Sequence, residues 1–470
     1  MPAKYIYWLI AGVFLIIISP NFLSHGMFMD GVIYASVARN LAESHGSWWA
    51  PFFTETRYPQ FFEHPPLMFW LLSFFYKVFG DHFFIEKIFS LSCVAVSCFL
   101  LHRIWSVFKL TNDSWLPILL FCSFPLIIWT ATNNMLENLL LVQLTAAVFY
   151  MIRFVNQRDM NAMLAASLLL CSAILTKGPV GLFVLVFPLT YGLLYAGKSV
   201  FNSLLDTAIL SLSTVSITAA IFLFNASAFH FLEAYYKEQI LHGMKDVMMV
   251  TSRWKIISFL GAELIIPALL MLAAWQWRDN KAHQKADAQK GLMLSFFLTG
   301  MCGVFPFMIS LKQSNFYIIP SLPFFALGAA IFVQQNVGSR IMKESWIGWK
   351  YWTLIVSAVF LIAIASIVIN TGKINRDRNM LRDIFAIKET IPQNKVLQTC
   401  LPLKDNFGLE AYLQRYGHWS LDTRESHQFY FYSADCGTPK PSEIILPSEN
   451  HSFFIYKTAP DQPPVLRSSD

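Results

Sequence analysis

The sequence is poor in charge. Only 14% of its 470 residues are Asp, Glu, Lys or Arg, whereas an average soluble domain has about 25%. Hydrophobic residues make up 55% of the chain, with 43 Phe and 14 Trp among them. So few charges exclude an ordinary soluble protein, and they place most of the chain in the hydrocarbon of a membrane.

The sequence also lacks the signatures of nucleic-acid binding and of zinc sites. The net charge of +6 is modest, and no run of Lys and Arg with interleaved aromatic residues occurs, so nucleic acid is not an expected partner. The 7 Cys residues include no Cys-x-x-Cys pair and no Cys/His spacing that suits zinc. Cys400 and Cys436 lie in a polar tail, where a disulfide and two separate thiols are both open.

Long apolar runs recur along the chain. A helix needs about 20 apolar residues to cross a bilayer, or about 17 at the short limit, so the sequence predicts about eleven spans. The two around Lys177 would form a tight hairpin. The first run is interpreted as a retained span, because no small-x-small cleavage site follows it. The expected spans are 5–22, 85–107, 115–132, 135–153, 161–176, 179–196, 203–224, 257–277, 291–310, 316–334 and 351–370.

Basic residues predict the orientation. With the N-terminus inside, every connection assigned to the cytoplasm carries Lys or Arg. Loops 23–84 and 225–256 and the tail from residue 371 then lie outside, in a chain of the plasma (inner) membrane. The tail alternates β-rich runs with an expected helix near 379–391, which fits a small α/β domain. The predicted fold is an all-α polytopic membrane domain over 1–370, followed by an extracytoplasmic α/β domain over 371–470.

The first outer loop carries more polar residues than a connector needs. Asp30 follows the first span and should lie at the membrane surface, as a general base or as the N-cap of a helix. Tyr34, Ala35 and Ala38 share one face of a helix expected to lie along the bilayer. Two prolines then fix Glu63 and His64, although an ordinary Pro-Pro turn has the same pattern. The following run, 67–80, is too short to span and predicts a re-entrant or interfacial helix.

Further polar residues recur at the outer ends of later spans. Each one alone is compatible with a solvated or snorkelling side chain, but ionisable residues gathered at one membrane face are functional candidates. Lysines at this depth suit a lipid phosphate, and a carboxylate suits proton removal from a hydroxyl group. A phosphate leaving group mainly needs electrostatic stabilisation. These residues are Asn133, Asn134, Glu137, Lys177, His242, Lys245, Lys312, Asn315 and Tyr317.

Taken in order, these motifs resemble those of the GT-C membrane glycosyltransferases, in the branch of 4-amino-4-deoxy-L-arabinose transferase and the protein O-mannosyltransferases. Lys177-Gly178-Pro179 is an intact Lys-Gly-Pro motif, and the resemblance covers residues 1 to about 335. The other matching segments are Asp30-Gly31 with Tyr34-Ala35-x-x-Ala38, His64-Pro65-Pro66-Leu67-Met68-Phe69-Trp70, Asn133 to Glu137, and Lys312 to Pro323, which is similar to Lys-x-x-x-Tyr-x-x-Pro-x-x-Pro.

The resemblance implies inverting transfer of a sugar from a polyprenyl-phosphate donor to a lipid (lipid A-like), glycan or protein acceptor. The sequence requires no cofactor or metal, although Asp30, Glu63 and His64 could bind a divalent cation. The implied roles are catalysis for Asp30, binding of the donor phosphate for His64, Lys177, Lys312 and Tyr317, and lining of the acceptor site for Glu63, Tyr34, Glu137, His242 and Lys245.

Three departures from the family pattern leave the sugar and the acceptor open. Gly31 stands in place of a second acid, His64 in place of a Lys, and loop 225–256 has no clear Arg-Phe pair. The charge of a histidine would change near neutral pH. A non-catalytic GT-C-like subunit therefore stays an alternative. A transporter or flippase of a lipid-linked substrate is another, but the sequence shows no internal repeat and its polar residues gather at one face.

Overall fold

The computed structural model describes most of the chain as two compact units. Each unit draws on more than one stretch of sequence. Unit 1 comprises Met1–Phe22, Phe62–Met68 and Lys87–Ile369, and unit 2 comprises Leu23–Phe61, Phe69–Glu86 and Asn370–Asp470. The described residues are 3–108, 110, 114–241, 250–277, 286–309, 311–337, 349–433, 436 and 452–457.

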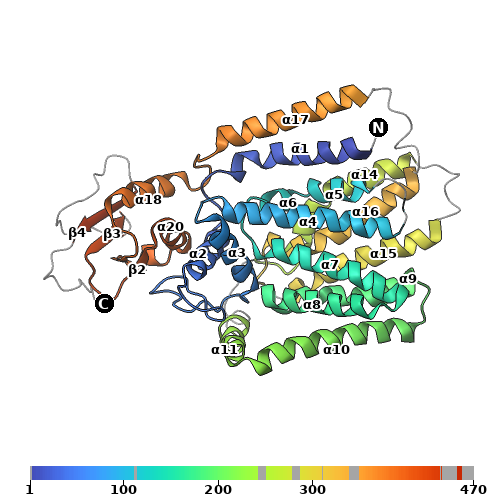
Figure 1. Ribbon diagram of the computed structural model, residues 1–470, viewed down its shortest axis with the longest axis horizontal. Coiled ribbons are helices and arrows are strands. Elements are labelled where there is room, and N and C mark those ends of the chain that lie inside the picture. The colour runs from blue at the N-terminus through green and yellow to red at the C-terminus, as the bar shows by residue number, and fades with distance from the viewer. Residues whose placement is uncertain are drawn as a thin grey trace. The chain divides into compact units, whose positions relative to one another are not determined.

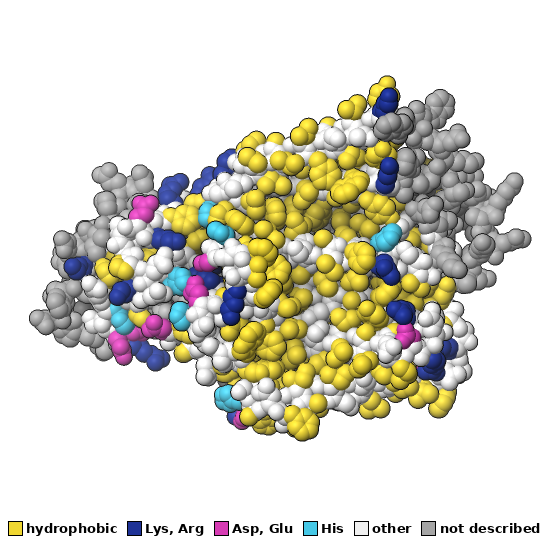
Figure 2. All heavy atoms as spheres, in the orientation of Figure 1, with side chains coloured by type: hydrophobic (Ala, Val, Ile, Leu, Met, Phe, Trp, Pro, Cys, Tyr) yellow, Lys and Arg dark blue, Asp and Glu magenta, His cyan; other side chains and the backbone are white. Residues whose placement is uncertain are grey.

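Unit 1 is helical (Figure 1). Hydrophobic side chains cover most of the visible surface over its helices (Figure 2), as expected of helices that face lipid. Its elements are α1 (Ala3–Phe22), α4 (Ile85–Val107), α5 (Trp115–Ser123), α6 (Pro125–Thr130), α7 (Leu136–Gln157), α8 (Met160–Lys177), η1 (Gly178–Leu185), α9 (Val186–Leu194), α10 (Val200–Phe224), α11 (Ala226–Tyr235), η2 (Tyr236–Leu241), α13 (Lys255–Glu263), α14 (Ile265–Gln276), α15 (Ala286–Cys302), η4 (Phe305–Ile309), η5 (Asn315–Ser321), α16 (Leu322–Val337) and α17 (Trp349–Asn370).

In the described part of the chain, 8 helices are long and apolar enough to cross a membrane, or 9 if α13 and α14 count as one span bent by 55°. The chain is therefore an integral membrane protein, with fewer such helices than the expected number of about eleven. Two differences, besides the bend between α13 and α14, account for this. The expected span 115–132 is broken into α5 and α6 at Pro125, because proline disfavours a helical conformation in the residue before it. The expected spans 161–176 and 179–196 form one helical segment, Met160–Leu194.

The chain nevertheless turns sharply inside that segment, as the hairpin prediction requires. Gly178 has a φ of +71°, a conformation that favours glycine. η1 then packs back on α8, since a Cβ built on Gly181 would lie 3.0 Å from Cβ of Ala173. Lys177 is thereby held at the end of α8, directly before the turn.

Two contacts tie the ends of unit 1 together. α1 and α17 lie side by side (Figure 1), where the hydroxyls of Ser19 and Ser366 are 2.5 Å apart and those of Tyr5 and Thr353 are 3.2 Å apart. Hydroxyl pairs of this kind hold neighbouring helices together in an apolar surrounding.

Unit 2 contains the expected α/β tail. Its four-stranded sheet has the order β2-β1-β3-β4, with β1 parallel to β2 and β3, and β4 antiparallel to β3. The helix expected near 379–391 is α18. The elements of this unit are α2 (Met29–Ala42), α3 (Leu67–Phe79, from Phe69 onward), α18 (Arg378–Thr390), β1 (Val396–Gln398), α19 (Leu401–Lys404), α20 (Phe407–Gly417), β2 (Ser420–Asp422), β3 (Phe429–Ser433) and β4 (Phe453–Lys457).

A disulfide joins Cys400 and Cys436, whose Cα atoms are 5.6 Å apart. The structure thus selects the disulfide over two separate thiols. Both residues belong to unit 2, where the bond links the segment after β1 to the segment after β3.

The first loop differs from its prediction in one respect. Tyr34, Ala35 and Ala38 do lie on a helix, α2, and α3 is the short apolar helix expected after the Pro-Pro pair. α2, however, is buried without interruption from Gly31 to Leu41, whereas a helix lying along a bilayer would bury only one face. The expectation of an interfacial helix is therefore wrong for α2.

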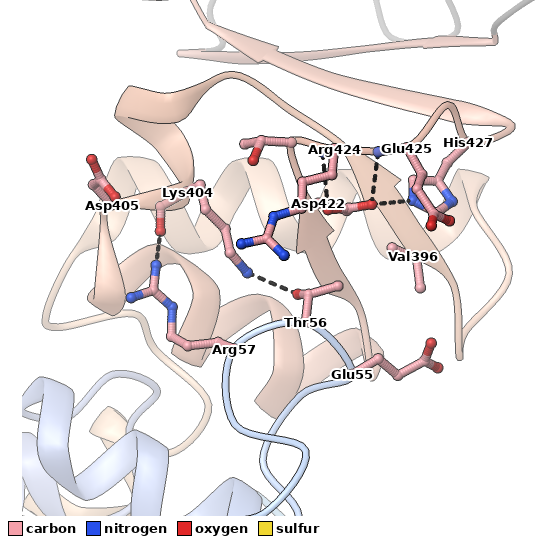
Figure 3. A pocket seen from close by; sticks show the side chains of 11 residues that line it. Glu55, Thr56, Arg57, Val396, Lys404, Asp405, Asp422, Arg424, Glu425 and His427 are labelled. Atoms are coloured by element: carbon pink, nitrogen blue, oxygen red, sulfur yellow. Dashed lines mark hydrogen bonds and ion pairs between the residues drawn. The ribbon is translucent and has the colours of Figure 1, made fainter. Parts of the chain in front are cut away.

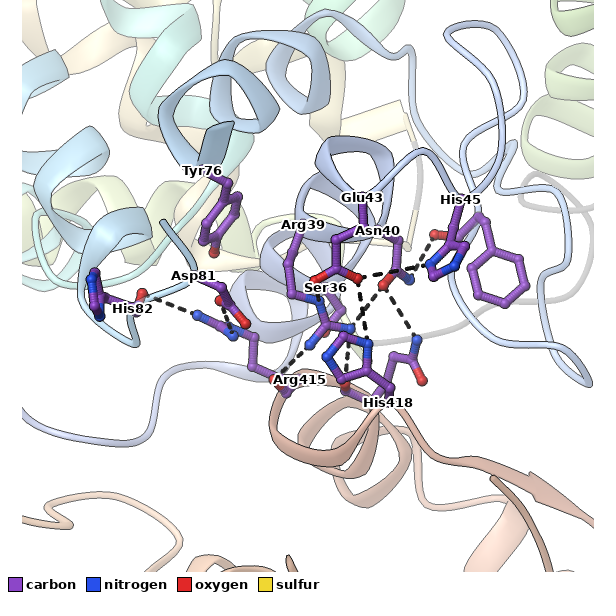
Figure 4. A network of polar contacts seen from close by, with 12 residues as sticks. Ser36, Arg39, Asn40, Glu43, His45, Tyr76, Asp81, His82, Arg415 and His418 are labelled. Carbon is purple, nitrogen blue, oxygen red and sulfur yellow. Dashed lines mark hydrogen bonds and ion pairs between the residues drawn. The ribbon is translucent and has the colours of Figure 1, made fainter. Parts of the chain in front are cut away.

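The tail buries α2 through a polar network (Figure 4). The buried Arg39 donates to the backbone oxygens of Arg415 (2.8 Å) and Gln414 (3.0 Å). Arg415 in turn pairs with Asp81 at 2.7 Å and Glu86 at 3.3 Å. Buried charges need such partners, because an unpaired one costs several kcal/mol. The network fixes α2 and the segment before α4 on α20.

Candidate functional site

Lys177 is the centre of the candidate site in unit 1. Its side chain is 12% exposed and forms an ion pair with Glu137, which is 1% exposed. The ammonium also lies over the rings of Tyr317 (4.9 Å to the centroid) and Phe316 (5.6 Å), where the face of an aromatic ring attracts a cation. Three segments far apart in the sequence, α7, the end of α8 and η5, thus meet at one ammonium group.

Local structure explains why these side chains are placed there. Glu137 is in the first turn of α7, where the helix dipole favours a negative charge. Lys177 is the last residue of α8, and the turn at Gly178 stops the helix there. Oε2 of Glu137 is buried and accepts no hydrogen bond from the described residues. The pair therefore leaves one acceptor oxygen unused.

The charges of Lys177 and Lys312 both act on the imidazole of His64. Burial, followed by Lys177 and then Lys312, lowers the pKa of His64 to about 3. The imidazole is therefore neutral at physiological pH. The expected change of charge near neutral pH is therefore wrong, because burial and two neighbouring cations oppose protonation of the imidazole.

The η5 segment is held firmly against its neighbours. The ring of Tyr317 stacks on Phe307 at 5.1 Å between centroids, and Phe316 stacks on Trp129 at 6.2 Å. The buried side chain of Gln313 accepts a hydrogen bond from the backbone N–H of Ile256 and donates to backbone oxygens of Phe307 and Arg253. The ring of Tyr317 is thus held by packing, and Lys312 stands directly before the anchored Gln313 in the sequence.

The remaining predicted residues lie elsewhere or outside the described structure. Asp30 is half-buried in the first turn of α2, and because the N-cap is Phe28, Asp30 is not the N-cap residue. Tyr34 is buried, with its ring 5.8 Å from that of Phe69. Glu63 is half-buried beside His64 in unit 1, whereas Asp30 and Tyr34 belong to unit 2. His242 and Lys245 lie outside the described residues.

Unit 2 has a polar pocket of its own, which the sequence did not predict (Figure 3). The cavity has a volume of ≈ 560 Å³. Lys404 in its wall is held by Thr56 Oγ1 at 2.8 Å, by Leu421 O at 2.6 Å and by the buried Glu410 at 2.8 Å. The pocket is lined by Glu55, Thr56, Arg57, Val396, Lys404, Asp405, Asp422, Thr423, Arg424, Glu425 and His427.

Two groups of side chains in unit 2 have ligand atoms close enough to hold a cation. Each group keeps its carboxylate and imidazole atoms within 4.8 Å of one another. In the group at the pocket, however, Asp422 already accepts hydrogen bonds from the backbone of Arg424 and Glu425 and faces His427 at 2.8 Å. That carboxylate is satisfied by the fold itself. The groups are Glu43, Asp81 and His418, and Asp422, Glu425 and His427.

The comparisons with known proteins bear on the same part of the chain. Residues 63–228 match the family described as dolichyl-phosphate-mannose-protein mannosyltransferase. The structure of ArnT from Cupriavidus metallidurans bound to undecaprenyl phosphate aligns with a TM-score of 0.66 and 14% identity, over 97% of this chain and 98% of that chain. The chain has the ArnT-like GT-C fold. The expected fold class is thereby confirmed.

Further comparisons are consistent with this fold. ArnT from the same organism in the apo state aligns with a TM-score of 0.59 and 15% identity, over 87% of this chain and 84% of that chain. No curated protein sequence matches the chain. The matched family segment contains Glu63, His64, Glu137 and Lys177.

The low pKa of His64 makes a testable prediction about stability. Unfolded, the imidazole takes up a proton near its ordinary pKa of about 6.5, whereas the folded protein resists protonation down to about pH 3. The unfolded state therefore binds more protons in this window, so the stability contributed by neutral His64 is present above pH 6.5 and is lost as the pH falls toward 3. A His64→Gln variant should show a shallower fall of the unfolding temperature between pH 7 and pH 4.

The matched control for this prediction is His230→Gln. His230 is an exposed histidine of the same unit, and its replacement shows how much of any change in slope comes from the loss of a histidine as such. Thermal unfolding of the purified protein in detergent at several pH values measures both variants. Equal slopes for His64→Gln and the wild type would show that His64 does not have the buried, cation-flanked environment described above.

Proposed function

We propose that the chain is a membrane glycosyltransferase that moves a sugar from a polyprenyl-phosphate-linked donor to an acceptor on the extracytoplasmic face. The observation that carries the proposal is the gathering of Lys177, Lys312 and Tyr317 in unit 1 of an ArnT-like fold. Cationic and hydroxyl groups at the ends of apolar helices suit a phosphate whose hydrocarbon tail stays in the bilayer. That the ArnT structure contains undecaprenyl phosphate supports the same ligand class.

The donor phosphate would bind between the two lysines. Lys177 and Lys312 supply the positive charge, the Tyr317 hydroxyl donates a hydrogen bond, and neutral His64 can donate one from its protonated ring nitrogen. Glu137 balances the charge of Lys177. It is then a positioning residue for the lysine, in addition to its proposed place beside the acceptor.

The reaction would be a single displacement. Asp30 removes the proton from an acceptor hydroxyl, and the acceptor oxygen attacks the anomeric carbon of the donor sugar as its bond to the phosphate oxygen breaks. The electron pair of that bond leaves with the polyprenyl phosphate, whose additional negative charge Lys177 and Lys312 stabilise. The proton ends on Asp30, and attack from the face opposite the phosphate inverts the anomeric centre.

The acceptor is proposed only by class. A lipid A-like glycolipid, another glycan and a protein hydroxyl all supply the oxygen nucleophile that this reaction needs. Glu63, Tyr34, His242 and Lys245 are the residues proposed to line the acceptor side. The proposed location is the inner membrane, with the N-terminus cytoplasmic and the site and the tail outside.

Transfer of a labelled sugar tests the proposal directly. Membranes containing the chain would receive polyprenyl-phosphate donors that carry a labelled pentose or hexose, together with cell-envelope fractions, and membranes without the chain are the control. Label should move to lipid, glycan or protein only where the chain is present, and the labelled product identifies the acceptor. If the chain moves the donor across the bilayer but never transfers the sugar, the flippase alternative is right instead.

A further inference from the structure

Side chains of helix α11 contact both the segment that carries His64 and the turn that follows Lys177. The ring of Phe62 meets His230 at 5.9 Å and Phe231 at 5.8 Å between centroids, both edge-on. Phe62 stands two residues before His64 in the sequence. One face of α11 thus holds the chain just before the Pro-Pro pair, entirely within unit 1.

The same helix reaches the turn after Lys177. Tyr235, the last residue of α11, stacks on Phe231 with ring centroids 5.9 Å apart and an angle of 14° between the rings. This stacking directs its hydroxyl at Gly178, where a built Cβ would lie only 2.7 Å from the Tyr235 oxygen. Glycine is therefore required at position 178 both for its positive φ and for the close approach of a phenol.

The Tyr235 hydroxyl is a donor without a hydrogen-bond partner among the described residues. Burial raises the pKa of this phenol, so it stays protonated at physiological pH. The hydroxyl can therefore donate a hydrogen bond to a ligand. It stands beside the turn that positions Lys177, where the proposed ligand brings acceptor oxygens.

We propose that Tyr235 is a further donor-binding residue, whose hydroxyl donates a hydrogen bond to the phosphate of the polyprenyl donor beside Lys177. The proposal rests on the proposed function and deepens it. The sequence placed His242 and Lys245 of loop 225–256 on the acceptor side. Tyr235 is a neutral hydroxyl of the same loop, and here it is placed on the donor side.

This assignment also gives α11 a mechanical role. Because Phe231 contacts Phe62 and Tyr235 contacts Gly178, a phosphate held by Tyr235 would be linked through one helix to both the His64 segment and the Lys177 turn. Such a hydrogen bond to a charged group is worth about 10-fold or more in affinity.

The test compares Tyr235→Phe with Tyr236→Phe in the full-length chain. Tyr235→Phe removes only the hydroxyl and keeps the stacked ring, while Tyr236 is the neighbouring tyrosine and is 51% exposed. Binding of undecaprenyl phosphate is measured at equilibrium in detergent, beside undecaprenol, which has the same tail and no phosphate. Thermal unfolding of each variant is recorded in parallel.

Tyr235→Phe should weaken undecaprenyl phosphate binding by about 10-fold, without changing undecaprenol binding or the unfolding temperature, and Tyr236→Phe should behave as the wild type. Equal affinity of Tyr235→Phe and the wild type for the phosphate would overturn the inference and leave the proposed function standing. An equal loss for both probes would also overturn it, because the hydroxyl would then act through packing. If the wild type does not distinguish the two probes at all, the proposed function fails, and the inference fails with it.

Discussion

An Asp30→Ala variant is expected to transfer sugar about 10²- to 10⁴-fold more slowly than the wild type, which is the usual contribution of a general base. Asp30 is the carboxylate that the resemblance assigns to catalysis, and it lies in the first turn of α2. Gly31 follows it, so no second acid stands next to Asp30 in the sequence to take over its role. The rate should fall through kcat, with the KM for the donor little changed.

The controls separate chemistry from folding. Thermal unfolding of Asp30→Ala beside the wild type separates a loss of chemistry from a loss of folding, since a slow variant that unfolds with the wild type has lost only the base. Asp30→Asn keeps the shape of the side chain but removes the base, and it should be as slow as Asp30→Ala. Asp405→Asn changes an exposed carboxylate of the same unit and should leave the rate unchanged. Wild-type rates in both Asp30 variants would assign the base to another residue.

Local patterns predicted much of the fold. Apolar runs indicated the long helices, and β-rich runs with one expected helix indicated the tail, because hydropathy and periodicity are properties of short stretches. The two apolar runs around Lys177 indicated the turn of the hairpin. A short stretch of sequence does not show which distant part of the chain packs against a helix. The sequence of α2 alone predicted a helix at the membrane surface. That prediction failed because the burial of α2 depends on Arg415 and its neighbours, which come hundreds of residues later.

Some residues of the candidate site could likewise be predicted from local sequence, and others could not. Lys177, Lys312 and Tyr317 could be predicted, since a lysine or tyrosine next to an apolar run is conspicuous. Phe316 and Tyr235 were missed, because in a chain with 43 Phe and 17 Tyr an aromatic residue carries no signal of its own. The pairing of Lys177 with Glu137 was also missed, because it spans 40 residues of sequence between two helices that only the fold brings together.

The ion pair of Lys177 and Glu137 makes the second prediction with a large effect. Removing one member of a buried pair leaves the other charge without compensation and typically costs about 3–5 kcal/mol. Lys177→Met should therefore destabilise the protein strongly, because Glu137 is 1% exposed. The double variant Lys177→Met with Glu137→Gln should recover most of that loss, because no unpaired charge remains. Thermal unfolding of the three proteins measures this part.

Binding of undecaprenyl phosphate should respond differently from stability, and this difference identifies the role of the lysine. Lys177→Met should weaken binding by about 10- to 100-fold, since a hydrogen bond to a charged group is worth about 1.5–3 kcal/mol, and the double variant should stay equally weak although it is stable. Glu137→Gln alone should bind the phosphate more tightly than the wild type, because Lys177 then has no competing carboxylate. If the double variant recovers affinity together with stability, Lys177 is a structural partner of Glu137 and the phosphate binds elsewhere.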